Sequence, residues 1–216
     1  MRTTGIVAAL LVSLSLLSFS QARGDELSAS YFPLKAGMRW EYTVTSTQGP
    51  TQKLLITNLA PREVSGAKVT PRKSEMGGET VIEFMKQDDT GTYRYAEHPG
   101  ENAPPQLITP MECHLKFPIT AGDTWNMATK VGNSTVNLTL TIDSVAAEVK
   151  VPAGTFKECV KIKQVSQDGA DPAVLGYEWY APKVGVVKSM VTIKPKTKEG
   201  AAAPENRIYE LVSFKP

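Results

Sequence analysis

Apolar and polar residues alternate along most of the chain, and this alternation predicts β-strands. In "RWEYTVTS", Trp40, Tyr42 and Val44 alternate with polar residues, and four apolar residues alternate in the same way over positions 136–142. A period of two places successive side chains on opposite faces of a strand, and one polar face is typical of half-buried antiparallel sheets. No long amphipathic helix is evident beyond the N-terminal stretch. Further alternating runs occur at 91–97, 159–165 and 207–214.

One phrase occurs twice and predicts how two strands begin. "FPLKAGMRW" starts at residue 32 and "FPITAGDTW" at residue 117, which is 85 positions later. The proline favours an extended entry, and Gly37 and Gly122 can adopt the positive φ of a sharp turn. Trp40 and Trp125 then begin a strand with a large apolar side chain. The phrase predicts two equivalent strands, each anchored in the core by its tryptophan.

The likeness between the two parts continues beyond this phrase. Glu83 and Glu178 are 95 positions apart, and Gly91 and Gly185 in the following turns are 94 apart. We therefore predict one all-β domain over residues 23–216, built from two similar β-meander halves at about 31–106 and 116–216. A sheet of about 10–12 antiparallel strands must curl, so we expect a strongly curved sheet or an open barrel.

The first 22 residues have the pattern of a secretory signal peptide. Arg2 precedes an apolar run that is short for a bilayer span, and Ser20 and Ala22 supply the small residues of a cleavage site. The pattern predicts an exported mature chain that starts at Arg23; an uncleaved anchor is the alternative. Nothing later in the sequence is long and apolar enough to be a transmembrane segment.

The charge balance argues against polyanionic partners. The chain has 24 Lys and Arg against 22 Asp and Glu, a formal net charge of +2. Without basic clusters, this balance predicts neither nucleic acid nor an anionic membrane surface as a partner.

Two cysteines fit an oxidising compartment and predict a disulfide between Cys113 and Cys159. Free thiols are one alternative. A metal or redox site is another, because Cys113 lies between Glu112 and His114. Neighbouring side chains on a strand point to opposite faces, which makes joint chelation by Cys113 and His114 difficult.

Few residues are suited to catalysis. The two histidines are His98 and His114, and no nucleophile elbow, phosphate loop or His-Glu-x-x-His motif is present. We therefore predict no enzyme activity, no cofactor and no metal. Glu83 and Glu178 could act as a pair of carboxylates, but each precedes an aromatic residue on an alternating strand. Solvent exposure is the favoured interpretation for both.

A ligand-binding surface is predicted on one face of the central strands. Its candidate lining is Ile82, Phe84, Tyr177 and Trp179. Tyr177 and Trp179 share a strand face, where aromatic side chains could stack on a sugar or contact a lipid. Packing in the core is the alternative, and for these two it is the favoured one.

Three segments resemble a family of exported bacterial proteins. They are "YFPLKAGMRWEY" from Tyr31, "VPAGTFKECVKI" from Val151 and "GYEWYAPKVGVVK" from Gly176. They are similar to phrases of the TapB-like family, a resemblance that implies a bacterial periplasmic or secreted protein and gives no catalytic residue. A wider likeness is to the LolA-like lipoprotein carriers, which are half-barrels with an apolar concave face.

The favoured function is non-enzymatic binding of an apolar or amphipathic ligand, or of an envelope protein segment, on the curved sheet. The alternative is a structural or assembly module that pairs through a sheet edge. An enzyme would need a cleft that gathers His98 or His114 with carboxylates.

Overall fold

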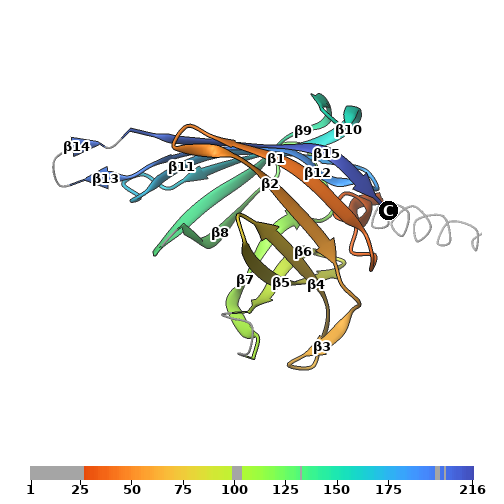
Figure 1. Cartoon of the computed structure of the whole chain (residues 1–216). Helices are drawn as coiled ribbons and strands as arrows, with labels where there is room; N and C mark the ends of the chain where they lie inside the picture. Colours follow the sequence, from red (N-terminus) through yellow and green to blue (C-terminus); the bar gives the residue numbers. More distant parts are fainter. Residues whose placement is uncertain (1–26, 99–103, 132, 198–199, 202) are drawn as a thin grey trace, which may run out of the picture.

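The computed structural model (Figure 1) describes residues 27–98, 104–131, 133–197, 200–201 and 203–216. The predicted signal peptide, residues 1–22, lies outside the described residues. Residues 27–30 are helical. The strands are β1 Arg39–Ser46, β2 Gly49–Asn58, β3 Arg62–Val64, β4 Ala67–Met76, β5 Glu79–Asp88, β6 Gly91–Glu97, β7 Gln106–Lys116, β8 Thr124–Val131, β9 Ser134–Val151, β10 Gly154–Ser166, β11 Ala173–Ala181, β12 Gly185–Lys194, β13 Lys196–Thr197, β14 Gly200–Ala201 and β15 Glu205–Lys215.

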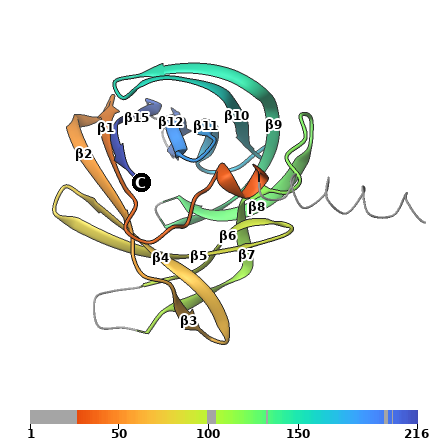
Figure 2. The same ribbon diagram turned by 90° about the vertical axis from the view of Figure 1, so that its right-hand side faces the viewer.

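Twelve strands form one continuous antiparallel sheet in the order β7-β6-β5-β4-β2-β1-β15-β12-β11-β10-β9-β8, with β3 paired to β4 at the side. The sheet curls into a barrel, which Figure 2 shows from one end. The two ends of the strand order, β7 and β8, are in contact, but no ladder between them is found in the described residues, so the barrel is nearly closed. The predicted all-β, single-domain open barrel is confirmed.

The strand order follows two successive meanders. The first contains β1, β2 and β4–β7, and the second contains β8–β12 and β15. Each repeated phrase leads into the first strand of one meander through a glycine with positive φ, Gly37 at 85° and Gly122 at 88°. The backbone bonds match as well: the Gly37 amide donates to the Asn58 carbonyl at 2.9 Å, and the Gly122 amide donates to the Ile142 carbonyl at 2.8 Å. These matches support our proposal that the halves are copies.

The segment before β1, residues 27–38, crosses one end of the barrel (Figure 2). We refer to it as the N-terminal segment. The Gln87 amide donates to the carbonyls of Ala29 and Phe32, and the Asn58 amide donates to those of Pro33 and Lys35, at 3.1–3.3 Å. Side chains of β5 and β2 therefore hold this irregular backbone, whose polar groups would be costly to bury without partners.

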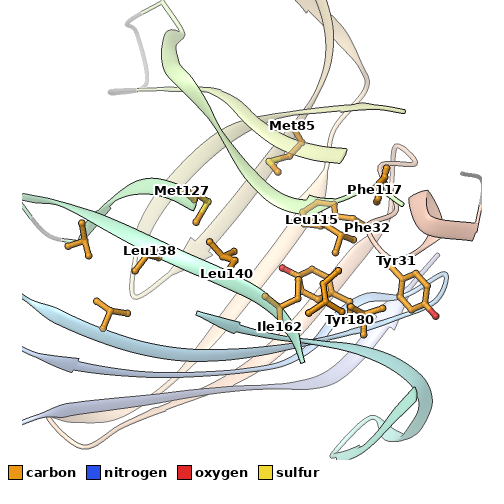
Figure 3. Packing of buried hydrophobic residues seen from close by; sticks show 14 residues of the cluster. Tyr31, Phe32, Met85, Leu115, Phe117, Met127, Leu138, Leu140, Ile162 and Tyr180 are labelled. Carbon is orange, nitrogen blue, oxygen red and sulfur yellow. The ribbon is translucent and has the colours of Figure 1, made fainter. Parts of the chain in front are cut away.

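The main apolar cluster fills the barrel beside this segment. Figure 3 shows Phe32 among buried side chains from distant strands, with Leu115 and Tyr180 close by. The rings of Phe32 and Tyr180 lie with their centroids 6.2 Å apart. The cluster consists of Tyr31, Phe32, Met85, Leu115, Phe117, Met127, Val136, Leu138, Leu140, Ile142, Val160, Ile162, Val174 and Tyr180.

Two hairpins add apolar contacts outside the sheet. The far part of the β9–β10 hairpin, residues 145–157, arches over β11, β12 and β15 (Figure 2), and β9 contacts all three. We call it the β9–β10 arm; its Val149, Val151 and Phe156 pack with Val187 and Trp179. The smaller β3–β4 hairpin packs Val64 and Val69 against a third cluster. Apolar residues are therefore needed on both faces of the sheet.

The predicted disulfide is wrong, because Cys113 and Cys159 are free thiols. Cys113 lies on β7, opposite Tyr93 of β6, and Cys159 lies on β10, opposite Ala147 of β9. Across the seam, β8 and β9 separate the two strands. At roughly 5 Å per strand, this separation far exceeds the 4.4–6.8 Å or so between the Cα atoms of a disulfide.

Candidate ligand-binding cavity in the barrel

A cavity of about 350 Å³ opens inside the barrel, next to the packed core. We call it the interior cavity. Its walls come from both halves, with β1, β2 and β4 on one side and β10, β11, β12 and β15 on the other. Four of its side chains are aliphatic, while the others bring an amide, two phenols, a hydroxyl and one charge of each sign. The lining consists of Tyr42, Leu54, Ile56, Arg72, Gln164, Glu178, Val186, Ser189, Val191 and Tyr209.

Arg72 is the buried cation of the interior cavity. Only 6% of its surface is exposed. Its guanidinium carbon lies 4.9 Å from the ring centre of Phe32 and 4.7 Å from that of Trp40, so two aromatic faces hold the group by cation–π contact. Within the described part of the chain, its guanidinium has neither a carboxylate within ion-pair distance nor a hydrogen-bonded side-chain acceptor.

The anion of the cavity, Glu178, is engaged by a tyrosine. The Tyr180 hydroxyl donates to the Glu178 carboxylate. Burial, followed by the charge of Glu178, raises the pKa of Tyr180, and Arg72 acts in the opposite direction. The protonated phenol of Tyr180 is the donor of this hydrogen bond, and the Glu178 carboxylate is the acceptor.

Tyr42 completes the polar part of the cavity. Its hydroxyl donates to the Val186 carbonyl at 2.7 Å, which fixes the ring orientation. Burial raises the pKa of Tyr42 well above its usual value, although the charge of Arg72 acts to lower it. The hydroxyl oxygen keeps lone pairs with which it could accept a hydrogen bond from a ligand.

A second hollow of about 200 Å³ adjoins the interior cavity, since Tyr209 lines both. Val44 and Met76 contribute apolar surface to it, and an ion pair between Arg207 and Glu205 lies at its side. The two hollows together extend from Arg72 past Tyr209 to Gly49 and Pro50 at the start of β2. A molecule longer than the interior cavity could follow this path.

Ile82 and Phe84, the first pair of predicted site residues, do not line the interior cavity. Phe84 is fully buried and packs with Val64 and Val69 of the β3–β4 hairpin, with Ile82 beside it. Its neighbour Met85 belongs to the main core inside the barrel. Since neighbours on a strand alternate, Phe84 and Ile82 are on the outer face, and neither lines the interior cavity.

Tyr177 and Trp179, the second predicted pair, lie next to each other on the outer face of β11. The rings of Tyr177 and Trp179 lie 6.2 Å apart, and the Lys161 ammonium sits 4.6 Å from the ring centre of Tyr177. Trp179 also packs with the cluster beneath the β9–β10 arm. The structure thus brings Tyr177 and Trp179 together but keeps them apart from Ile82 and Phe84. A binding role for these four residues stays a prediction that the interior cavity does not support.

The expected solvent exposure of the two glutamates is wrong. Glu178 lines the interior cavity, and Glu83 accepts a hydrogen bond at 2.9 Å from Arg94, which lies opposite Met85 on the inner face. The two strands alternate as predicted, but the glutamates face the inside of the barrel and the neighbouring aromatic residues face outward. The layers outside the sheet bury aromatic side chains there, and the sequence pattern carries no signal for which face the barrel encloses.

A second charged cluster lies near the seam between β7 and β8. Arg94 bonds Glu83 and also Glu112, which it reaches at 2.8 Å, and Glu97 follows at 3.6 Å. Carboxylates of the protein thus neutralise the partly buried guanidinium of Arg94, whereas Arg72 has no such partner among the described residues. Among the described residues, no three side chains of His, Cys, Asp or Glu gather as metal ligands. His98 and His114 do not meet in a shared cleft with carboxylates: His98 stacks near Phe84, and His114 lies beside Glu112.

Comparison with known proteins gives two distant structural neighbours. No family model and no curated protein matches the chain. A candidate lipoprotein from Parabacteroides distasonis is 14% identical, with a TM-score of 0.42, and a candidate exported protein with a YmcC-like fold from Bacteroides fragilis is 16% identical, with a TM-score of 0.44. Each alignment covers 86% of this chain and 98% of the neighbour. The resemblance to the TapB-like and LolA-like families stays a prediction.

No helix in the described part of the chain has the length and hydrophobicity of a membrane-spanning segment.

Proposed function

We propose that this protein is exported from a bacterial cell and binds a small amphipathic molecule inside its barrel. The interior cavity carries this proposal. Its volume of about 350 Å³ lies at the lower end of the range for ligand pockets, roughly 300–1,000 Å³. Leu54, Ile56, Val186 and Val191 offer apolar contact, and a few polar groups at fixed positions could orient the ligand, which is the usual division of roles in such pockets.

The edge-pairing alternative has weaker support. β7 ends the strand order, but its pairing with β6 is irregular: Arg94 lies opposite Glu112, whereas Ala96 lies opposite Leu107. The intervening residues 108–111 bulge from the ladder and include Pro110, which lacks an amide donor. Bulges and prolines protect a sheet edge against addition of another strand.

The test is binding of the neutral probe N-phenyl-1-naphthylamine to protein purified from outside the cytoplasm of its host. The mass of this protein should correspond to a chain that starts at Arg23. The fluorescence of the probe should rise at micromolar protein, because the probe enters an apolar site. Ser189→Trp, which fills the interior cavity from β12, should abolish this rise.

The matched control is Met190→Trp, which places the same ring one residue later on the exposed face of β12. Probe binding should survive in this variant. If the probe does not bind the natural protein, or if both variants bind it equally well, the proposed function is wrong.

A further inference from the structure

The interior cavity contains donors that the protein does not use. The Arg72 guanidinium has five N–H groups and is 6% exposed, yet no acceptor side chain from the described residues is bonded to it. Its nitrogens are not among the described side-chain atoms that are both fully buried and without a partner, so they reach the surface of the cavity, where water can accept from them. The acceptors of this cation are therefore supplied from within the cavity, by water or by a ligand.

The surroundings of Arg72 hold it in a fixed orientation without neutralising it. Phe32 and Trp40 contact the guanidinium through their ring faces at 4.9 and 4.7 Å. Trp40 is itself fixed by a hydrogen bond from its Nε1 to the Val184 carbonyl at 2.7 Å. A cation–π contact with a ring face uses no N–H hydrogen bond, so the donors of Arg72 stay available, and a guanidinium can bind the two oxygens of a carboxylate with two of them.

A partly buried arginine of the barrel, Arg94, shows the contrast. Arg94 has Glu83 and Glu112 as hydrogen-bonded partners at 2.9 and 2.8 Å, so its charge is compensated by the protein. Among the described residues, Glu178 supplies the one carboxylate in the lining of the interior cavity. It accepts a bond from Tyr180 and is not within ion-pair distance of Arg72.

From these contacts we infer that the ligand of the interior cavity is a carboxylate amphiphile and that Arg72 binds its head group. This inference rests on the proposed function and specifies its ligand class. The Arg72 guanidinium donates two hydrogen bonds to the carboxylate. The apolar chain lies along Leu54, Ile56 and Val191 and extends past Tyr209. Repulsion by Glu178 keeps the carboxylate on the Arg72 side of the cavity.

The test compares three ten-carbon ligands by calorimetric titration of the natural protein at pH 7.5. They are decanoate, decanol and decyltrimethylammonium, which share the chain and differ in the head group. Decanoate should bind roughly ten- to a hundredfold more tightly than decanol, the gain expected from hydrogen bonds to a charged group. The cation should bind least, because it meets Arg72.

Substitutions at Arg72 test whether this residue causes the preference for decanoate over decanol. Arg72→Gln should reduce decanoate affinity to that of decanol or below it, because Glu178 then repels the carboxylate without a compensating cation, and decanol affinity should change much less. Arg72→Lys should restore part of the preference, since it keeps the charge but not the two-pronged geometry. The control Lys73→Gln removes the same charge from the neighbouring position, which faces the other side of β4, and should leave decanoate binding intact.

The outcomes separate the two proposals. If decanol binds as tightly as decanoate, or the cation binds most tightly, the carboxylate inference is wrong while ligand binding stands. If none of the three binds, both proposals are wrong. The comparison of ligands on the natural protein decides the inference even if the Arg72 variants do not fold.

Discussion

Trp40 and Trp125 occupy equivalent places in the two halves but contribute to the core to different extents. Trp40 is 1% exposed, carries Arg72 on its ring face and donates to the Val184 carbonyl. Trp125 is half-buried at the edge of the main core and donates to the Cys113 carbonyl at 2.8 Å. The repeated phrase predicted the shared role of the two residues, whereas their unequal burial depends on the neighbouring elements.

Replacing each tryptophan with alanine should therefore have unequal effects on stability. Trp40→Ala should lower the free energy of unfolding by about 3–5 kcal/mol, the range for large buried aromatic residues. Trp125→Ala should cost clearly less, because part of its ring already faces solvent. Urea unfolding followed by circular dichroism measures both. Equal losses, or a larger loss for Trp125→Ala, would contradict this account of the two sites.

At the scale of elements, the two meanders differ in what precedes their first strand. Asn58 at the end of β2 and Ile142 in β9 accept equivalent backbone bonds, from Gly37 and Gly122 respectively. The Ile142 side chain belongs to the main core, whereas the Asn58 side chain bonds the N-terminal segment. At these equivalent positions, Asn58 supplies the side-chain donor that holds the N-terminal segment, whereas Ile142 contributes to the core.

Asn58→Ala should loosen the N-terminal segment, because the carbonyls of Pro33 and Lys35 lose their donor. Hydrogen exchange measured by mass spectrometry should become faster in peptides that cover residues 27–38. Exchange in the central strands should change much less, since local opening does not require global unfolding. Asn137→Ala, at an exposed position of β9, is the control and should leave this pattern unchanged. Unaltered exchange over residues 27–38 in Asn58→Ala would show that these bonds do not hold the segment.

For the whole molecule, buried acidic groups limit stability at high pH. Burial raises the pKa of the Cys113 and Cys159 thiols from 9.0 to about 11 and also raises the pKa of Tyr42 and Tyr180. The folded protein therefore keeps these protons to a higher pH than the unfolded chain does. Because of this proton linkage, the buried groups do not reduce the stability of the fold below about pH 9. Stability then falls progressively as the pH rises towards 11.

Urea unfolding at intervals from pH 8 to pH 11 should show this loss. In Cys159→Ala, one titrating group is removed, so stability should fall less steeply with pH than in the natural protein. Val160→Ala is the control, because it truncates a neighbouring buried side chain without removing a proton, and its pH dependence should match the natural one. A Cys159→Ala profile as steep as that of the natural protein would argue against a buried, protonated thiol at this position.

The sequence by itself determined the strands, the turns at Gly37 and Gly122 and the division into two meanders. These features follow from local chemistry: alternation sets the two faces of a strand, and glycine permits the positive φ of a turn. Only the tertiary structure decided which face the barrel encloses. The β3–β4 hairpin and the β9–β10 arm bury apolar residues on the outer face, so Phe84 and Trp179 lie outside while Arg72 and Glu178 lie inside. Likewise, the distance between Cys113 and Cys159 depends on how far apart β7 and β10 lie around the barrel, which no local pattern encodes.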